Sequence, residues 1–311
     1  MSLVSMKNVV KSYGSKLSVD HLQLDIEEGD IFGLLGPNGA GKSTAIKMMC
    51  GLLKIDSGEV TVCGISVATN PLEVKKNIGL VPQDLAIYEN LSAKENVTFF
   101  AKLHGLRGRL LSERVEEALS FVGLQDRQQE RPQTFSGGMK RRLNIACAIM
   151  HRPKLIIMDE PTVGIDPQSR NHILDAVKQL NRMGSTIIYT SHYMEEVESL
   201  CSRVGIIDHG RLIACGTTEE LRKQVSQEEK LTVEVVQLKQ STVEELRMHA
   251  RIKKVLVNEN TIEMYLESVQ PILQDILFIL SKHQVAIHSL TRVEPDLETL
   301  FLSLTGRTLR D

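Results

Sequence analysis

Residues Ile31–Leu35 (IFGLL) and Gly36–Thr44 (GPNGAGKST) are the stretch of sequence that decides the fold. The first segment is a short apolar run, which is typical of a buried strand, and a helical pattern from Ala45 to Cys50 follows the second segment. The second segment fits the phosphate-binding pattern G-x-x-x-x-G-K-[ST]. A strand, a glycine-rich loop and a helix in this order predict an α/β protein whose loop holds the phosphates of a nucleotide.

Glycines in such a loop let the backbone approach a phosphate closely, so that successive N–H groups and the helix N-terminus point at the anion. The Lys42 side chain would reach the β- and γ-phosphates, and the Ser43 hydroxyl would bind Mg²⁺. The alternative is an ordinary glycine-rich turn, which the strand and the helix on either side disfavour. The residues predicted to bind the nucleotide in this loop are Gly36, Pro37, Asn38, Gly39, Ala40, Gly41, Lys42, Ser43 and Thr44.

A second apolar run, Leu155–Met158 (LIIM), ends in the two carboxylates of Asp159 and Glu160. An apolar run without alternation is typical of a central strand in a parallel sheet, and ligands bind at the carboxyl ends of such strands. We therefore expect Asp159 to hold Mg²⁺, directly or through water, and Glu160 to orient and polarise an attacking water. A strand that ends in a solvated acidic turn is the alternative.

The segment Phe135–Arg142 (FSGGMKRR) runs into a helical pattern at Leu143–Met150. Ser136 is a good N-cap residue, and Gly137 and Gly138 leave the first N–H groups of the helix accessible. A helix start of this kind attracts anions, here a γ-phosphate. An ordinary capped helix is the alternative if the segment is taken by itself.

These segments, taken in order, resemble the ATP-binding subunit of an ABC transporter. Gly36–Thr44 matches the Walker A motif, Ser136–Gly138 the signature motif and Leu155–Glu160 the Walker B motif. The signature departs from the usual pattern, because Met139 replaces its last glutamine and Phe135 replaces its first leucine. The serine and both glycines remain, so the resemblance implies an active ATPase with ATP and Mg²⁺ as cofactors.

Single residues elsewhere extend the resemblance. Gln83, in VPQD, matches the Q-loop glutamine that senses Mg²⁺ and the attacking water, and His192, in TSHY, matches the switch histidine that contacts the γ-phosphate. Residues 164–167 (GIDP) resemble the D-loop. Tyr13 is similar to the aromatic residue that stacks on adenine, with packing at a strand end as its alternative. The implied catalytic residues are Glu160, His192 and Gln83, and the implied Mg²⁺ ligands are Ser43, Gln83 and Asp159.

The resemblance also implies partners. In the family, a helical subdomain at about residues 84–135 carries the signature away from the ATP of its own chain, and apolar spacing at Ala93–Leu106 and Ser112–Val122 agrees with helices there. This implies a head-to-tail dimer, either a homodimer or a heterodimer, with each ATP between Walker A of one subunit and Ser136 of the other. The loop Asp84–Glu89 would receive an ABC-2 type membrane permease subunit, unless it packs on its own domain. The chain would then be a peripheral protein at the cytoplasmic face of the cell membrane.

The sequence predicts two domains, an ABC ATPase domain at 1–225, with a mixed sheet core and the helical subdomain, and an accessory domain at 226–311. In the second domain, strand and helix signals follow one another as βαββαβ, which predicts a small α+β, ferredoxin-like domain. Apolar spacing at residues 294–307 predicts a last helix. This tail, with FSGGMKRRL and TSHYMEE, resembles ATPases of ABC-2 type drug exporters, the daunorubicin-resistance kind and within it the Bacillus linearmycin-resistance type. Regulation, dimer stabilisation and mere packing remain open as roles of this domain.

Composition narrows the class of function. The net charge is −2, so we expect no binding of nucleic acid. The N-terminus does not resemble a signal peptide, no apolar run reaches membrane-spanning length, and the five cysteines lack metal-type spacing. The leading hypothesis is an ATPase subunit that powers efflux of an antibiotic or another amphipathic compound. The alternatives are a sensory or regulatory ABC module and a non-transport ABC ATPase.

Overall fold

The computed structural model describes residues 2–224, 229–293 and 297–306. Contacts divide the chain into one unit of Met1–Thr218 with Thr305–Asp311 and a second unit of Glu219–Leu304. The helix α8 (Thr218–Gln224) groups with the second unit, which puts this boundary a few residues before the predicted one at residue 225. No helix among the described residues is both long and apolar enough to cross a membrane.

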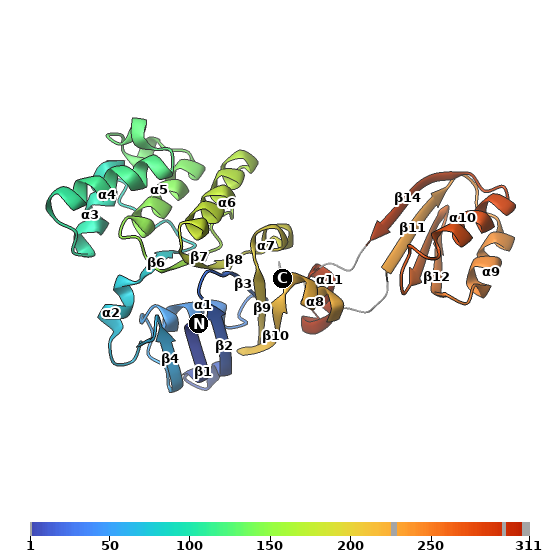
Figure 1. Cartoon of the computed structure of the whole chain (residues 1–311), viewed down its shortest axis with the longest axis horizontal. Coiled ribbons are helices and arrows are strands. Elements are labelled where there is room, and N and C mark those ends of the chain that lie inside the picture. The colour runs from blue at the N-terminus through green and yellow to red at the C-terminus, as the bar shows by residue number, and fades with distance from the viewer. Residues whose placement is uncertain (1, 225–228, 294–296, 307–311) are drawn as a thin grey trace. The chain divides into compact units, whose positions relative to one another are not determined.

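A six-stranded sheet forms the centre of the first unit, with strand order β10-β9-β3-β8-β7-β6 (Figure 1). Every pair is parallel except β9 with β10, so the sheet is mixed, as the sequence predicts. All residues of β3 and β8 are buried, because both faces of the sheet are covered. The strands are β3 (Ile31–Leu35), β6 (Ile78–Val81), β7 (Leu155–Asp159), β8 (Thr186–Thr190), β9 (Arg203–Asp208) and β10 (Arg211–Thr217).

A second, antiparallel sheet has the order β2-β1-β4-β5. Its strands are β1 (Ser2–Tyr13), β2 (Lys16–Glu27), β4 (Ser57–Val62) and β5 (Ile65–Ser66). Residues of this sheet, of α1 (Lys42–Met49) and of the six-stranded sheet share one apolar core, which includes Met6, Leu24, Phe32 and Met48. The helix that follows the phosphate-binding loop is therefore fixed by packing against both sheets.

The helices α3 (Ala93–Leu103), α4 (Gly108–Phe121) and α5 (Gly137–Ile149) contact one another and form a helical subdomain, drawn in green in Figure 1. The two predicted helices are confirmed, with different ends. The helix α3 begins at a capping box in which Ser92 accepts from Glu95 N–H and Glu95 accepts from Ser92 N–H. It ends before Gly105, whose φ of 85° is unfavourable for any residue with a side chain.

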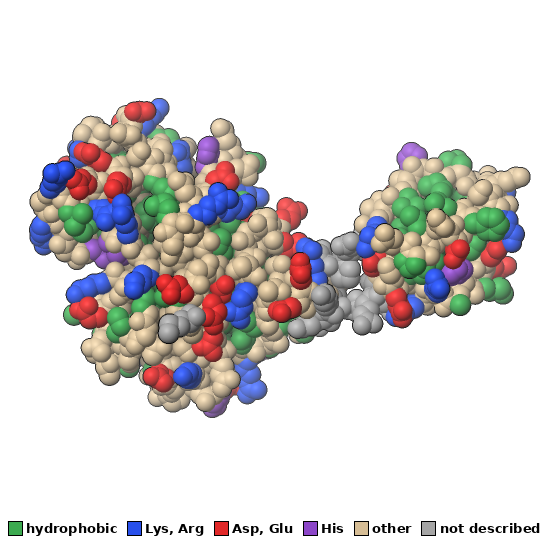
Figure 2. Space-filling model, viewed as in Figure 1, with side chains coloured by type: hydrophobic (Ala, Val, Ile, Leu, Met, Phe, Trp, Pro, Cys, Tyr) green, Lys and Arg blue, Asp and Glu red, His purple; other side chains and the backbone are tan. Residues whose placement is uncertain are grey.

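The other helices of the first unit are α2 (Pro71–Lys76), α6 (Pro167–Arg182) and α7 (Met194–Leu200). Asp166 caps α6, because its side chain accepts a hydrogen bond from Ser169 N–H at 2.9 Å. This bond holds the pKa of Asp166 below its usual value, so the cap stays charged at neutral pH. Acidic and basic side chains are interspersed over the face shown in Figure 2, in keeping with the small net charge.

In the second unit, the elements follow one another as β11 (Glu229–Val235), α9 (Gln240–Met248), β12 (Ile252–Asn258), β13 (Thr261–Leu266), α10 (Leu273–Lys282) and β14 (Ile287–Val293). The strand order is β12-β13-β11-β14, all antiparallel, and both helices lie on one face of the sheet (Figure 1). That order of elements is the predicted one, and the ferredoxin-like class stays a prediction. The helix α10 begins at Leu273, after Pro271, because a proline disfavours the helical conformation of the residue before it.

The last helix, α11 (Leu297–Thr305), agrees with the predicted helix at 294–307, of which 294–296 and 307 lie outside the described residues. Its apolar side chains Leu297, Leu300 and Phe301 are buried. None of the five cysteines forms a disulfide, and burial raises the pKa of Cys50 to about 12. The buried residues Cys50, Cys147 and Cys201 therefore act as small apolar residues.

The lowered pKa of His151, which stacks on His104, makes the free energy of unfolding depend on pH. His151 lies with its ring centroid 3.7 Å from that of His104, and its Nε2 is 3.1 Å from the Ile78 carbonyl oxygen. Burial, aided by His104, lowers the pKa of His151 to about 4, from an ordinary value of 6.5. The folded state therefore binds fewer protons than the unfolded state between these two values, and the stability that the neutral ring contributes is lost as pH falls.

We expect acidification from about pH 7 to about pH 5 to reduce the free energy of unfolding by on the order of 1–2 kcal/mol through His151 alone. Urea unfolding of the wild type and of His151→Gln at both pH values measures this contribution, because glutamine can donate to Ile78 but does not titrate. The variant should lose less stability than the wild type on acidification. An equal loss in both proteins would show that His151 is not the responsible group.

Candidate nucleotide site

The phosphate-binding loop lies between β3 and α1, as predicted, and close packing fixes its shape. Gly41 has a φ of 108°, and a Cβ there would lie 2.7 Å from the Ser18 carbonyl oxygen, so only glycine fits. The Lys42 Nζ donates to the carbonyl oxygens of Gly36 and, at 3.3 Å, of Pro37. The Lys42 side chain is buried, which lowers its pKa, while Glu160 opposes this shift. The ammonium group is thus held inside the curve of the loop.

A cavity of about 650 Å³ opens on this loop. It contains most of the predicted residues, from separate parts of the chain, together with side chains that the motifs do not name. Its lining residues are Tyr13, Lys16, Ser18, Pro37, Asn38, Gly39, Ala40, Gly41, Lys42, Ser43, Thr44, Gln83, Glu160, Val163, His192 and Tyr193. Tyr13, at the end of β1, is 49% exposed, so one ring face is free to stack on a base.

Three predicted catalytic side chains meet in this cavity. Glu160 follows β7, and its carboxylate Oε1 lies 2.5 Å from His192 Nε2, beyond the end of β8. Its Oε2 accepts a hydrogen bond at 3.0 Å from Gln83 Nε2, beyond the end of β6. Because Glu160 is 7% exposed, these partners are nearly all that surround its charge. The structure therefore brings a carboxylate, an imidazole and an amide together beside the phosphate-binding loop.

Glu160 has an unusual backbone conformation, with a φ of 50°. For a residue with a side chain this left-handed conformation costs about 1–3 kcal/mol, and such strain persists only where neighbours enforce it. The Glu160 N–H donates to Thr190 Oγ1 at 2.9 Å, and the same hydroxyl donates to Asp159 Oδ1 at 2.7 Å. One threonine thus holds the Asp159 carboxylate and the Glu160 backbone, although no motif pointed to it. The sequence feature that could have revealed Thr190 is a polar residue at the end of an apolar strand.

The donor set fits Mg²⁺, which prefers oxygen ligands and keeps several waters. Ser43 and Gln83 line the cavity with a hydroxyl and an amide, whereas Asp159 does not line it and is held by Thr190. Among the described residues, no group of three or more histidine, cysteine, aspartate or glutamate side chains could hold a metal. Phosphate oxygens and water would therefore have to complete the coordination of the ion.

The signature residues lie apart from the cavity of their own chain. Ser136 caps α5 by accepting from Met139 N–H at 3.2 Å, and neither Gly137 nor Gly138 lines the cavity. A Cβ at Gly138 would overlap the Ser169 side chain, so the start of α5 packs closely against α6. The nucleotide cavity within one chain therefore lacks Ser136, as a site shared between two chains requires.

A link that the motifs did not reveal joins the signature helix to the Q-loop. Arg141, on α5, donates to the carbonyl oxygens of Pro82 at 2.8 Å and Gln83 at 2.6 Å. Its side chain is buried, which lowers its pKa. In the sequence Arg141 is only a basic residue after the signature, because its partners lie 59 and 58 positions away.

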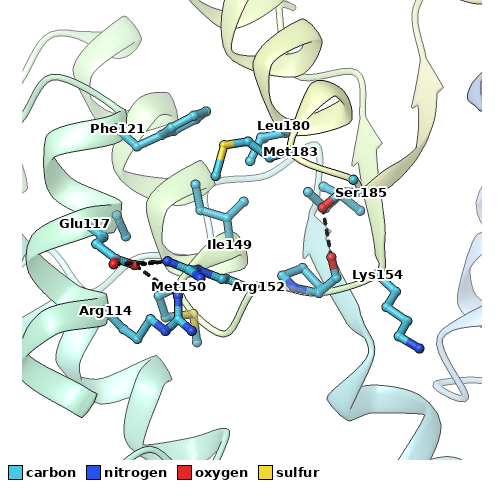
Figure 3. A pocket seen from close by; sticks show the side chains of 14 residues that line it. Arg114, Glu117, Phe121, Ile149, Met150, Arg152, Lys154, Leu180, Met183 and Ser185 are labelled. Carbon is cyan, nitrogen blue, oxygen red and sulfur yellow. Dashed lines mark hydrogen bonds and ion pairs between the residues drawn. The ribbon is translucent and has the colours of Figure 1, made fainter. Parts of the chain in front are cut away.

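Another cavity, of about 260 Å³, lies between α4, α6 and the chain before β7 (Figure 3). Glu117 on one wall pairs with both Arg114 and Arg152, and the opposite wall includes Ser185, which donates to the Pro153 carbonyl oxygen. The lining includes none of the predicted site residues. This cavity is smaller than the one of about 650 Å³ that the predicted nucleotide-binding residues line.

Known proteins share this arrangement. The family model "ABC transporter" matches residues 19–163. The linearmycin resistance ATP-binding protein of Bacillus subtilis is 46% identical over 99% of this chain and 100% of its own length. The daunorubicin/doxorubicin resistance ATP-binding protein of Streptomyces peucetius is 34% identical over 99% of this chain and 94% of its own length.

Solved structures agree. A dimeric ATP-binding cassette in a post-hydrolysis state, bound to ADP and Pi, matches with a TM-score of 0.63 and 27% identity, over 69% of this chain and 98% of that chain. An ATP-binding subunit of an ABC transporter matches with a TM-score of 0.66 and 29% identity, over 72% and 93%. The chain thus belongs to the ATP-binding subunits of ABC transporters, is an ATPase, and falls within the drug-exporter type to which the linearmycin and daunorubicin resistance proteins belong.

Proposed function

We propose that the chain hydrolyses Mg²⁺-ATP at a site shared with a second ATPase subunit, and thereby powers efflux of an antibiotic or another amphipathic compound. The compound would pass through a separate ABC-2 type permease, with the chain bound to it at the cytoplasmic face of the membrane. The observation that carries the hydrolytic part is the contact of Glu160 with both Gln83 and His192 beside Lys42. Relatives named for drug resistance support the choice of substrate class.

In this proposal each residue has a separate role. The N–H groups of residues 36–44 and the Lys42 ammonium bind the phosphates, and the face of Tyr13 receives the base. Glu160 orients the attacking water and accepts its proton, while Gln83 and His192 hold the carboxylate and sense the γ-phosphate. A bound Mg²⁺, held by Ser43 and Gln83 with Asp159 behind them, would neutralise charge on the phosphates.

A second cassette would complete the site. Ser136 and Gly137 are exposed at a helix start with a partial positive charge, which suits the γ-phosphate of a partner subunit. A head-to-tail dimer would bring this helix start over the cavity of the other chain, whether that chain is identical or different. ATP would then join the two subunits, and hydrolysis would release them.

A groove beside the Q-loop supports the proposal that the chain binds a membrane permease. A cavity of about 270 Å³ is lined mainly by apolar groups that include Leu52, Ile78 and Phe100, and Ala86 from the loop Asp84–Glu89 forms part of its wall. In the same loop, Leu85 is 40% exposed and Tyr88 49% exposed. Exposed apolar groups around an apolar groove suit a short amphipathic helix of a permease.

The second unit contains none of the proposed nucleotide-binding or catalytic residues. We assign it an accessory role and a ferredoxin-like class, on the basis of its βαββαβ order and its separate apolar core. ATP binding and hydrolysis are assigned to residues 1–225. The helical subdomain is assigned to about residues 84–135, with the helix α5, which packs against α3 and α4, added to it.

Replacing Lys42 with alanine tests the phosphate-binding loop. Loss of a charged hydrogen-bond partner should weaken ATP binding by about 1.5–3 kcal/mol, which is roughly a 10- to 150-fold increase in Kd. Equilibrium binding of a fluorescent ATP analogue measures this change. Lys47→Ala removes an exposed lysine of the same helix and should leave Kd unchanged. Near-normal affinity of Lys42→Ala would contradict the assignment of the loop.

Replacing Glu160 with glutamine tests both the base and the dimer. Loss of the base should lower kcat by about 10²- to 10⁴-fold, while ATP binding persists. The variant should therefore accumulate as an ATP-bound dimer in size-exclusion chromatography. Adding Ser136→Glu should prevent this dimer, because a carboxylate would repel the partner's γ-phosphate. Wild-type turnover by Glu160→Gln, or a dimer that tolerates Ser136→Glu, would refute the respective part of the proposal.

Replacing Leu85 with aspartate tests the docking of a permease. A charge in the apolar contact should reduce the amount of polytopic membrane protein that co-purifies with the tagged chain from detergent-solubilised membranes of its host by at least about tenfold. Leu110→Asp, at a similarly exposed leucine of α4, is the matched control. Equal recovery of membrane protein with both variants would place the permease contact elsewhere.

A further inference from the structure

Glu196 is a buried acidic residue to which the proposed chemistry assigns no role. It lies on α7 and is 4% exposed. Its Oε2 accepts hydrogen bonds from the hydroxyls of three residues, Thr162 at 2.9 Å, Tyr189 at 2.8 Å and Ser191 at 2.7 Å. A buried carboxylate is stable only where donors surround it, and bonds to a charged oxygen are stronger than neutral ones. This cluster is therefore a rigid point in the structure.

The second oxygen extends the cluster to α6. Glu196 Oε1 lies 3.4 Å from Arg170 Nε, which makes an ion pair rather than a well-formed hydrogen bond. The Arg170 guanidinium lies 4.4 Å from the centroid of the Tyr193 ring, and Tyr193 lines the nucleotide cavity. Burial raises the pKa of Tyr189, so its hydroxyl remains a donor to Glu196.

The hydroxyl partners stand next to the catalytic residues in the chain. Thr162 lies two residues after Glu160, in the loop between β7 and α6, and Ser191 directly precedes His192. A single carboxylate thus binds both loops, the one that carries the base and the one that carries the switch histidine. Displacement of a reacting group by about 1 Å can cost roughly 10²-fold in rate, so the relative position of these loops matters.

We propose that Glu196 is a positioning residue for ATP hydrolysis, which fixes the loops of Glu160 and His192 relative to each other through Thr162 and Ser191. The inference rests on the proposed roles of Glu160 and His192, but not on the permease or on the compound transported. Glu196 contacts neither the phosphate-binding loop nor, among its described partners, any side chain that would touch ATP. Its effect should therefore fall on turnover and not on ATP affinity.

Glu196→Gln keeps the shape of the side chain but removes its charge. An amide oxygen in the place of Oε2 accepts more weakly from the three hydroxyls, and an NH₂ group in the place of Oε1 faces the Arg170 Nε–H donor. We expect kcat to fall by at least about tenfold and the Kd of ATP to stay within about threefold, in the full-length protein. Glu195→Gln makes the same charge change one residue earlier, at an exposed position, and should keep the wild-type kcat. Equal kcat values for the two variants would overturn the proposal.

A double variant separates positioning through His192 from a general loss of structure. If Glu196 acts by placing His192 against Glu160, then adding Glu196→Gln to His192→Ala should lower kcat by no more than about twofold, because the two residues act as a unit. If the reduction of kcat in the double variant equals the product of the reductions in the two single variants, Glu196 does not act through His192.

Hydrogen exchange gives a readout that does not depend on turnover. Glu196→Gln should speed amide exchange at residues 162–165 and 191–193, and leave residues 38–44 unchanged. Thr162→Val keeps Glu196 but removes one of the hydroxyl bonds. It should speed amide exchange in the loop that follows Glu160 and lower kcat about threefold or more. This variant replaces Glu196→Gln if Glu196→Gln does not fold. If the variants exchange faster than the wild type but the wild type itself has no ATPase activity, only the proposed function is refuted. If the variants and the wild type exchange at the same rate, the positioning role is refuted.

Discussion

The parallel pairing of β3, β8 and β7 is the constraint on which the rest of the molecule depends. The register places Phe32 and Ile157 beside Ile188, and Asp159 beside Thr190. Strands that run in the same direction end at the same edge, so the three loops that follow them emerge together. The phosphate-binding loop, Glu160 and His192 come from distant parts of the sequence and meet because of this edge. The sheet geometry thus brings the loops together, and only local contacts within and between the loops are needed to place their side chains.

That adjustment is made by buried charges with a defined set of partners. The Lys42 ammonium binds carbonyl oxygens of its own loop, and the Glu160 carboxylate is shared between an amide and an imidazole. Each of these groups would be costly to bury alone, and each is stable only in this arrangement. The strained backbone of Glu160 has the same explanation, since the Thr190 bonds and the surrounding sheet enforce it. The site is therefore preorganised before a nucleotide arrives.

Local chemistry was predictable from sequence, and contacts across the fold were not. A phosphate-binding loop is a contiguous segment, so its spacing alone indicates strand, loop and helix, and an apolar run ending in Asp159 and Glu160 behaves likewise. The start of α3 at Ala93 was predicted from apolar spacing, and the capping box of Ser92 and Glu95 fixes it. Thr190 and Glu196 were missed because their partners lie as far as 34 positions away, and no spacing in the sequence encodes such a pair. The end of α3 and the start of α10 depended on single residues with special backbone preferences, Gly105 and Pro271.

The signature helix α5 has an exposed start at Ser136 and also makes hydrogen bonds to the Q-loop. Its exposed start, Ser136, faces away from its own cavity, while Arg141, within the same helix, holds the carbonyl oxygens beside Gln83. Hydrogen bonds to a charged group contribute about 1.5–3 kcal/mol each, so moving this helix must either break two of them or carry the Q-loop with it. Gln83 is the same residue that binds Glu160. A second subunit that engages Ser136, as proposed, would therefore act on a helix that is already connected to the Glu160 carboxylate. Two parallel hydrogen bonds from Arg141 and one further bond from Gln83 make that connection, so assembly and hydrolysis would be coupled through the same contacts.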